Sequence, residues 1–229
     1  MKCLRKPSLV SLTILFLAWS SGHSVATDDD FQTWQQVNAT KKIEDGITAT
    51  LEVQPRFTED ASRLGQLLIR PYVGFTLFDQ TVLSLGYAYV RTSPSDGPVT
   101  HEHRPWQQLA FPILSRPRLF TLSNRTRFEQ RYREDGDEIG LRLRQQLRLM
   151  VPIAGTDWQA VAWSEGFFNL NDTDWGAEAG LDRWRNFAGI NIPVGEGVTL
   201  EPGYMNQFVN RTTTDQVDHI VSVTLNMNF

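Results

Sequence analysis

Cysteine is almost absent from this sequence of 229 residues, and the only one is Cys3. Cys3 lies in a segment with the features of an export signal, so we expect the mature chain to contain no thiol. A small secreted domain held together by disulfides is therefore excluded. The absence is typical of a bacterial envelope protein with one domain of moderate size.

The first 26 residues have the three parts of a secretory signal peptide. Lys2, Arg5 and Lys6 form a basic start, Ser8 to Trp19 an apolar run, and Ser24-Val25-Ala26 a cleavage site with small residues. We expect cleavage after Ala26, which leaves residues 27–229 as a single domain. No segment of the sequence reaches the roughly 20 apolar residues that a membrane-spanning helix needs.

Lysine is also scarce. After the signal the only lysines are Lys41 and Lys42, whereas 17 arginines remain. Without the signal, 19 basic residues stand against 26 acidic ones, a formal charge of −7, which does not indicate a nucleic-acid partner. Arginine forms paired hydrogen bonds with carboxylates even where water is excluded, so its dominance indicates ion pairs in an interior such as that of a barrel.

Charged and apolar residues alternate along the chain, most clearly from Leu119 to Val151. This stretch has the pattern of two strands joined by the acidic loop 134–138. Successive residues of a strand point to opposite faces, so one face of this hairpin is charged and the other apolar. The charged face contains Arg125, Arg127, Glu129, Arg131, Arg133, Arg142, Arg144, Gln146 and Arg148.

The same period of two recurs along the mature chain and gives eleven segments. Short turns at 79–80, 154–157 and 195–197 alternate with longer loops at 92–99 and 171–182, as in barrels of the outer membrane. We therefore predict an all-β fold, an antiparallel up-and-down transmembrane β-barrel of about 10–12 strands. Single-chain bacterial barrels normally have an even number of strands, so the pattern leaves the exact number open.

Small and aromatic residues also have expected places. On the segment 83–89, Ser84, Gly86 and Ala88 share the charged side, where we expect them to leave room for arginines of neighbouring strands. Tryptophans, together with tyrosines, are expected in girdles at the two membrane interfaces. The tryptophans after the signal are Trp34, Trp106, Trp158, Trp163, Trp175 and Trp184.

The last segment, Val217 to Phe229, alternates strictly and ends on Phe229. This pattern resembles the signal by which outer-membrane barrels are delivered to the barrel-assembly machinery, which we expect as a partner. Combined with the export signal, the pattern favours an apolar face directed toward lipid. In the alternative, a soluble periplasmic β module, the apolar face would point inward.

Particular residues across nearly all of the mature chain resemble a known family. They are Trp34, Arg56-Phe57, Arg70-Pro71, Gly86-Tyr87, Glu102-His103-Arg104, the run from Arg125 to Arg131, Arg142-x-Arg144, Glu165-x-Phe-Phe, Arg185, Gly203-Tyr204 and His219. The pattern is similar to the outer-membrane β-barrel family DUF2490, a domain of unknown function. The resemblance implies a barrel in the outer membrane of a Gram-negative bacterium, and it carries no catalytic residue.

The charged face defines a predicted lumen in which positive charge exceeds negative. Its arginines could attract anions, as in a porin-like channel. Alternatively, in a narrow barrel the side chains could fill the interior as an ion-pair core. The lumen residues are Arg56, Arg70, Arg104, Arg125, Arg127, Glu129, Arg131, Arg142, Arg144, Arg148, Glu165, Arg185 and Glu201.

Metal and catalytic motifs are weak. His101 and His103 share one face of a strand, without an evident third ligand, so no metal site and no cofactor are predicted. Barrel lipases and deacylases carry His-x-Ser on one strand, and the mature chain has no such motif. A serine and a histidine brought together from different strands would be needed for nucleophilic catalysis.

We therefore expect an integral outer-membrane barrel with a narrow arginine-rich lumen and a structural or small-solute, anion-handling role. Outer-membrane lipids and lipopolysaccharide are the expected partners. The alternatives are an outer-membrane enzyme acting on lipid or lipopolysaccharide, and the soluble periplasmic module. The sequence leaves the solute and the oligomeric state open.

Overall fold

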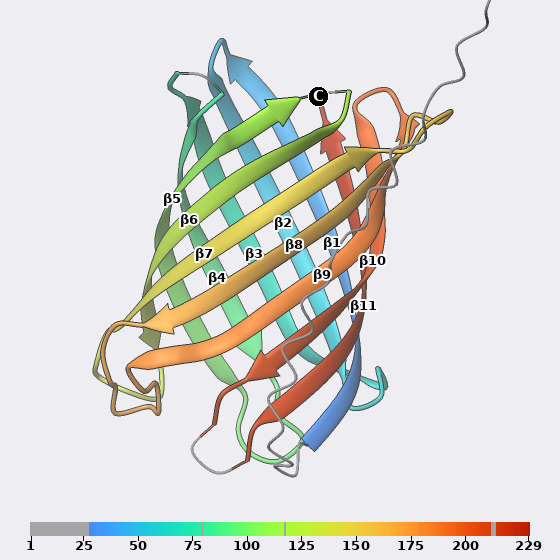
Figure 1. The fold of residues 1–229 in the computed structure, drawn as a ribbon. Helices are drawn as coiled ribbons and strands as arrows, with labels where there is room; N and C mark the ends of the chain where they lie inside the picture. Colours follow the sequence, from blue (N-terminus) through green and yellow to red (C-terminus); the bar gives the residue numbers. More distant parts are fainter. Residues whose placement is uncertain (1–27, 79, 117, 212–213) are drawn as a thin grey trace, which may run out of the picture.

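The computed structural model describes residues 28–229 except 79, 117 and 212–213, and the predicted signal lies outside these residues. The described residues form one closed barrel of eleven strands (Figure 1), without a helix long and apolar enough to cross a membrane. The strands are β1 (Asp28–Glu44), β2 (Ile47–Thr58), β3 (Arg63–Thr76), β4 (Val82–Thr92), β5 (Thr100–Arg116), β6 (Phe120–Arg133), β7 (Gly140–Pro152), β8 (Gln159–Asn169), β9 (Gly180–Gly195), β10 (Val198–Val209) and β11 (Gln216–Asn228).

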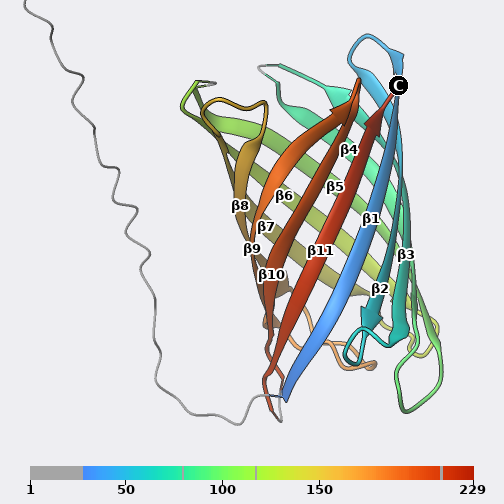
Figure 2. The ribbon, with the colours of Figure 1, turned by 90° about the vertical axis from the view of Figure 1, so that its right-hand side faces the viewer.

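Neighbouring strands along the chain pair antiparallel, as predicted, and β1 and β11 close the barrel in parallel. The closing register pairs Asp28 with Gln216 and Thr40 with Asn228. Figure 2 shows these two strands side by side. The parallel pair follows from the odd number of strands, because in an up-and-down order the first and eleventh strands run the same way.

The two rims of the barrel differ in the length of their connections. The rim with the C-terminus, here the short-turn rim, has connections of 2, 5, 3, 6 and 2 residues, and the long-loop rim has connections of 4, 7, 6, 10 and 6 residues. The amide of Phe229 donates to the carbonyl of Thr40 at 2.9 Å, which ties the chain end to β1 at the short-turn rim. The predicted alternation of short and long connections is present.

The barrel is charged inside and apolar outside. On β2, Glu52 is buried, whereas the neighbouring Leu51 is 47% exposed. On β7, Arg144 is buried and Leu147 is 48% exposed. Since alternate residues of each strand point to opposite faces, the charged side of the hairpin faces the lumen.

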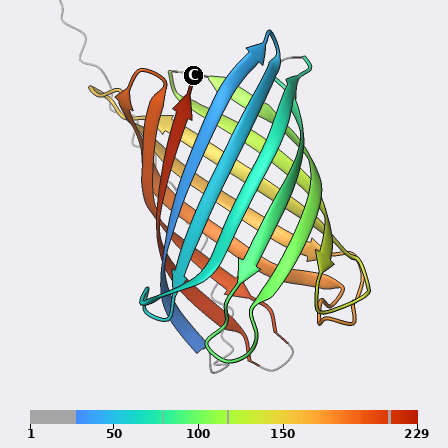
Figure 3. The same ribbon diagram turned by 180° about the vertical axis from the view of Figure 1, so that it is seen from behind.

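Aromatic rings fill part of the interior. A Cβ atom on Gly86 would lie 2.2 Å from the ring of Trp106, so glycine leaves space for this fully buried indole. We expected that space to hold arginines; instead the Arg127 guanidinium stacks on Trp106, with its carbon 4.1 Å from the ring centroid. Figure 3 shows this wall of the barrel from behind, with β1 to β5 coloured blue to green.

The girdle prediction was wrong for half of the tryptophans. Trp34 and Trp106 are buried in the interior, and Trp163 packs against Phe187 in an interior cluster. The alternation of residues along each strand explains this. Trp106, for example, is four residues from Glu102 and therefore lies on the same, inward side of β5. Trp158 and Trp184 are on the outside, with 43% and 39% of their surfaces exposed.

Two predicted segment boundaries also change. The sequence predicts a weak first strand over residues 33–42, whereas the strand covers residues 28–44, because β11 and β2 pair with it on both sides. The predicted loop 171–182 ends earlier, at 179, because β9 begins at Gly180. Asp182 therefore belongs to a strand and reaches the interior network.

Candidate functional site

The structure places the thirteen predicted lumen residues inside the barrel. Each is buried, lines an interior cavity, or does both. With Arg183, and without Arg133 and Arg211 at the rim, the described interior holds eleven arginines against the seven carboxylates of Glu52, Glu102, Glu129, Glu165, Asp182, Glu201 and Asp218, a formal excess of four positive charges. Strand alternation brings these side chains together, since they come from nine strands, β2, β3 and β5 to β11.

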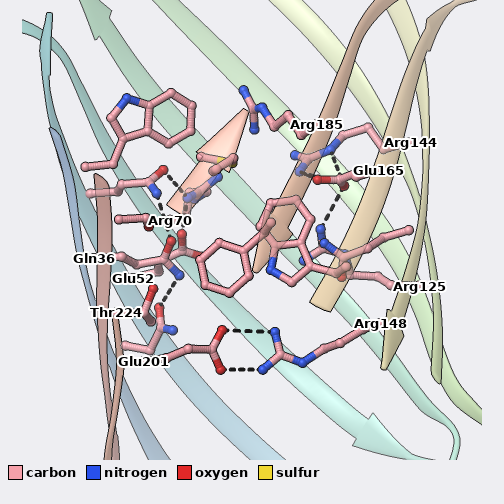
Figure 4. A pocket seen from close by; sticks show the side chains of 18 of the residues that line it. Gln36, Glu52, Arg70, Arg125, Arg144, Arg148, Glu165, Arg185, Glu201 and Thr224 are labelled. Carbon is pink, nitrogen blue, oxygen red and sulfur yellow. Dashed lines mark hydrogen bonds and ion pairs between the residues drawn. The ribbon is translucent and has the colours of Figure 1, made fainter. Parts of the chain in front are cut away.

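A chain of ion pairs crosses the hairpin of β6 and β7. Glu129 accepts hydrogen bonds from Arg142 Nη2 at 2.5 Å and from Arg144 Nη1 at 2.8 Å. Arg144 also donates from Nε to Glu165 at 3.0 Å, and Arg125 Nη2 donates to the same carboxylate at 2.7 Å (Figure 4). Buried charges are tolerated where they are paired and hydrogen-bonded in this way.

Glu102 on β5 forms a second cluster with two arginines. Arg104 donates from Nε at 2.5 Å and from Nη2 at 2.7 Å. Arg131 donates from Nε at 2.6 Å and from Nη2 at 3.1 Å. One carboxylate thus accepts four hydrogen bonds from two guanidinium groups, which leaves one positive charge of this cluster unbalanced.

Arg148 and Glu201 form a third pair, nearer the short-turn rim. Arg148 Nη1 donates to Glu201 at 3.1 Å, and a second, parallel hydrogen bond joins Nη2 to the other carboxylate oxygen (Figure 4). Arg70 pairs with Glu52 across β2 and β3. The two-bond geometry is the arrangement in which arginine holds a carboxylate most strongly.

Several members of the network were missed by sequence reasoning. Asp182 accepts from Arg183 Nε at 2.7 Å and lies 3.4 Å from Arg142 Nη1. The sequence predicts a loop at this position, and on a regular strand Asp182 would face away from Arg185, three residues later. The register between β8 and β9 shifts at Asp182, which interrupts this alternation. Glutamines also act as acceptors in the network. For Gln54 and Gln207, only the alternation of residues along each strand could have predicted an inward side chain.

Arg56 and Arg185 differ from the other buried arginines. Among the described side chains, neither has a carboxylate within 4.0 Å. Arg56 Nε donates to Gln54 at 3.1 Å, and Arg185 Nε donates to Gln207 at 2.7 Å. Both guanidinium groups stack on the indole of Trp34, and that of Arg185 also lies 4.5 Å from the ring centroid of Phe167. Neutral acceptors and aromatic rings thus hold two buried positive charges.

Interior cavities lie on both sides of a layer of arginines. A cavity of about 280 Å³ reaches toward the short-turn rim, past Glu201 and Asn226. A second cavity of about 480 Å³ reaches toward the long-loop rim, past Pro94 and Arg211. Both are lined by Arg56, Arg70, Arg144 and Arg185, the four side chains that we call the septum because they separate the two cavities.

The longest loop packs over the long-loop rim. Trp175 donates from Nε1 to the carbonyl of Glu138 at 2.8 Å, and its ring lies over the guanidinium carbon of Arg131, 4.7 Å away. At the same rim, a hydrogen bond from Arg133 lowers the pKa of the exposed Asp135 carboxyl. The loop thus contacts arginines that line the larger cavity.

Comparison with known proteins identifies the family. A family model described as "Protein of unknown function (DUF2490)" matches residues 31–218, which is most of the chain. The chain belongs to the DUF2490 family. An uncharacterized protein of Methylorubrum extorquens is 37% identical over 226 residues, which cover 97% of this chain and 98% of that one.

The three described histidines of this DUF2490 chain are not part of the septum. His101 and His103 contact Tyr89 and Tyr87 through Nδ1, and His219 contacts Tyr204 at 2.6 Å. Among the described residues, no serine is hydrogen-bonded to a histidine, and no group of three or more potential ligands could hold a metal ion. These tyrosine–histidine pairs are on the outward faces of their strands.

Proposed function

We propose that this protein is an integral β-barrel of the Gram-negative outer membrane, with a lumen that is mostly closed by ion pairs and attracts small anions. The observation that carries the proposal is that charged side chains are buried inside the barrel while apolar side chains are exposed outside it. Glu129 and Glu165 are each 2% exposed, whereas Leu51, Leu85 and Val221 on the outside are 44–47% exposed. Water would favour the opposite arrangement, and lipid favours this one.

The dimensions of the barrel support this proposal. The shortest strands, β4 and β8, have 11 residues. At about 3.3 Å per residue such a strand is about 36 Å long, and a tilt of about 40° gives a height of about 28 Å. An apolar band of an outer-membrane barrel is about 25 Å high.

Under this proposal the outward side chains contact membrane lipids and lipopolysaccharide. The long-loop rim would face the cell exterior and the short-turn rim the periplasm, as the connection lengths of such barrels suggest. The alternating strand β11 would be the segment that the barrel-assembly machinery binds. In the lumen, paired arginines would serve folding, and the excess of positive charge would attract anions.

A substitution on the outer face tests the membrane location. Leu85→Arg places a charge on the proposed lipid face, where arginine costs about 2–4 kcal/mol at mid-membrane depth. In a soluble protein the same exposed substitution would change stability by about 0.5 kcal/mol or less. Asp157→Arg, in an exposed connection of the short-turn rim, is the matched control.

The measurement is the yield of folded, heat-modifiable protein in the membrane fraction of a Gram-negative host. We expect wild type and Asp157→Arg to require detergent for extraction, and Leu85→Arg to assemble at least tenfold less well. Release of the wild type by high salt alone, or equal assembly of all three proteins, would overturn the proposal.

A further inference from the structure

The cavity at the long-loop rim is strongly positive. Ten of its lining residues are arginines, and the only acidic one is Glu102. Glu102 is already held by Arg104 and Arg131, so it offers no further compensation. Ligand pockets typically have volumes of about 300–1,000 Å³, and this cavity of about 480 Å³ is large enough for a small solute.

Two buried arginines of this cavity have no acidic partner among the described residues. Arg56 and Arg185 are 8% and 6% exposed, and their hydrogen-bond acceptors are the side-chain oxygens of glutamines. The terminal nitrogens of Arg185 make no hydrogen bond to a described residue, since its one bond, to Gln207, uses Nε. They therefore remain available to a molecule in the cavity.

Trp34 holds the two guanidinium groups near one another. The carbon of the Arg56 guanidinium is 3.6 Å from the ring centroid, and that of Arg185 is 4.8 Å from it. The two carbons are thus at most 8.4 Å apart, the sum of these distances. A phosphate hydrogen-bonded to a guanidinium lies about 4 Å from its carbon, so one phosphate can bind both groups when their carbons are up to about 8 Å apart.

A third arginine of this cavity, Arg70, is only partly hydrogen-bonded. The Nε of Arg70 is fully buried and has no hydrogen-bond partner among the described residues, although the side chain pairs with Glu52 through Nη2. Buried donors without acceptors are uncommon, and each one destabilises the folded state. Arg70 lines the same cavity as Arg56 and Arg185.

We propose that Arg56 and Arg185, on the platform of Trp34, form a binding site for a phosphate group in the cavity at the long-loop rim. Two guanidinium charges without carboxylates match the charge of a phosphate, which is about −1.5 to −2 at neutral pH. A neutral solute would leave both charges uncompensated. This site deepens the proposed anion-handling function and rests on it, and it assigns that function to three residues.

The phosphate could belong to a free solute or to a lipid headgroup. Calorimetric titration of the purified full chain, folded in detergent, distinguishes the two. The probes are inorganic phosphate and dihexanoyl phosphatidic acid at constant ionic strength. Binding of inorganic phosphate assigns a soluble ligand, and binding of the lipid alone assigns a headgroup. If neither probe binds, the proposal is overturned.

Arg185→Gln tests the site itself, and Arg116→Gln is the control because it removes the same charge from an exposed position at the other rim. We expect the Kd of the probe to rise at least tenfold in Arg185→Gln and to stay unchanged in Arg116→Gln. An equal Kd in both variants and the wild type would contradict the proposal.

Gln66→Glu provides a second test that preserves the interior. The side-chain oxygen of Gln66 accepts from Arg56 Nη1 at 2.7 Å, and its nitrogen donates to the hydroxyl of Thr92 at 2.9 Å. A glutamate would keep the first bond with a charged oxygen, and the Thr92 hydroxyl can donate to the other. This internal carboxylate would neutralise Arg56, so we expect a folded protein that binds at least tenfold more weakly.

The calorimetric result is independent of the membrane location, because the protein is purified and folded before titration. A chain that fractionates as soluble but binds phosphate through Arg185 would overturn the outer-membrane proposal alone. A chain that resides in the membrane but gives the same Kd with and without Arg185 would overturn the phosphate site alone.

Discussion

Glu129 on β6 lies directly opposite Arg142 on β7, and the carboxylate of the first accepts two hydrogen bonds from the guanidinium of the second. Glu129 is 2% exposed, and Arg144 also binds it, so one carboxylate pairs with two buried cations. This buried pair lies in the part of the sequence where charged and apolar residues alternate most clearly.

The first prediction concerns this pair. Glu129→Leu leaves Arg142 and Arg144 without a shared carboxylate, which we expect to cost about 3–5 kcal/mol. Arg127→Leu, which removes two hydrogen bonds to Gln108, should also weaken assembly. Phe128→Leu on the outward face should cost about 1 kcal/mol. Urea unfolding of refolded barrels measures all three, and equal midpoints would show that the interior pairs do not stabilise the fold.

The second prediction concerns the contact between Gly86 and Trp106. Gly86→Ala places a methyl group where the buried indole now lies, so we expect a loss of about 1–3 kcal/mol, as for overpacking. Gly195→Ala is the control, because its new methyl would be 3.8 Å or more from its neighbours. A smaller ring in the double variant Gly86→Ala with Trp106→Phe should restore part of the loss. No difference between the two alanine variants in urea would contradict the contact.

The third prediction concerns the two rims. Peptide tags inserted at Gly155 and at Gly176 would lie in connections of opposite rims, and an added Cβ at either glycine meets no atom within 4 Å. If the proposed orientation is right, antibody labels intact cells only when the tag is at Gly176, and labels both forms after the outer membrane is permeabilised. Labelling of the Gly155 form alone on intact cells would reverse the orientation.

The fourth prediction concerns the loop at the long-loop rim. Trp175→Ala removes a hydrogen bond to Glu138 and the stacking on Arg131. We expect loop opening to become easier by about 1.4 kcal/mol, a factor of about ten in the rate of limited proteolysis within residues 170–179. Trp158→Ala, at an exposed position of the other rim, is the control. Equal cleavage rates would mean that Trp175 does not hold the loop.

Period-two alternation was sufficient to predict the barrel and the direction of its charged face, because burial in a strand depends on parity alone. The same rule explains why Glu102 and Glu165 reach arginines from β6. Residues at segment ends were less predictable. Asp182 was placed in a loop, since local composition does not show how far β9 extends beside β8 and β10.

Long-range pairing was the part that the sequence did not determine. The parallel contact of β1 with β11 depends on the number of strands, and the weak pattern of β1 left that number open. The stacking of Arg56 and Arg185 on Trp34 was missed for the same reason, because these residues come from β2, β9 and β1 and no local pattern relates them.

The parallel seam has a consequence for folding kinetics. Asn38 on β1 is hydrogen-bonded to Asn226 on β11, 188 residues later in the chain. Such distant contacts form slowly, because the chain must lose much of its freedom before they are made. Until β11 is in place, one edge of β1 is unpaired and open to wrong partners. Barrel closure is therefore the step at which this chain is most exposed to aggregation.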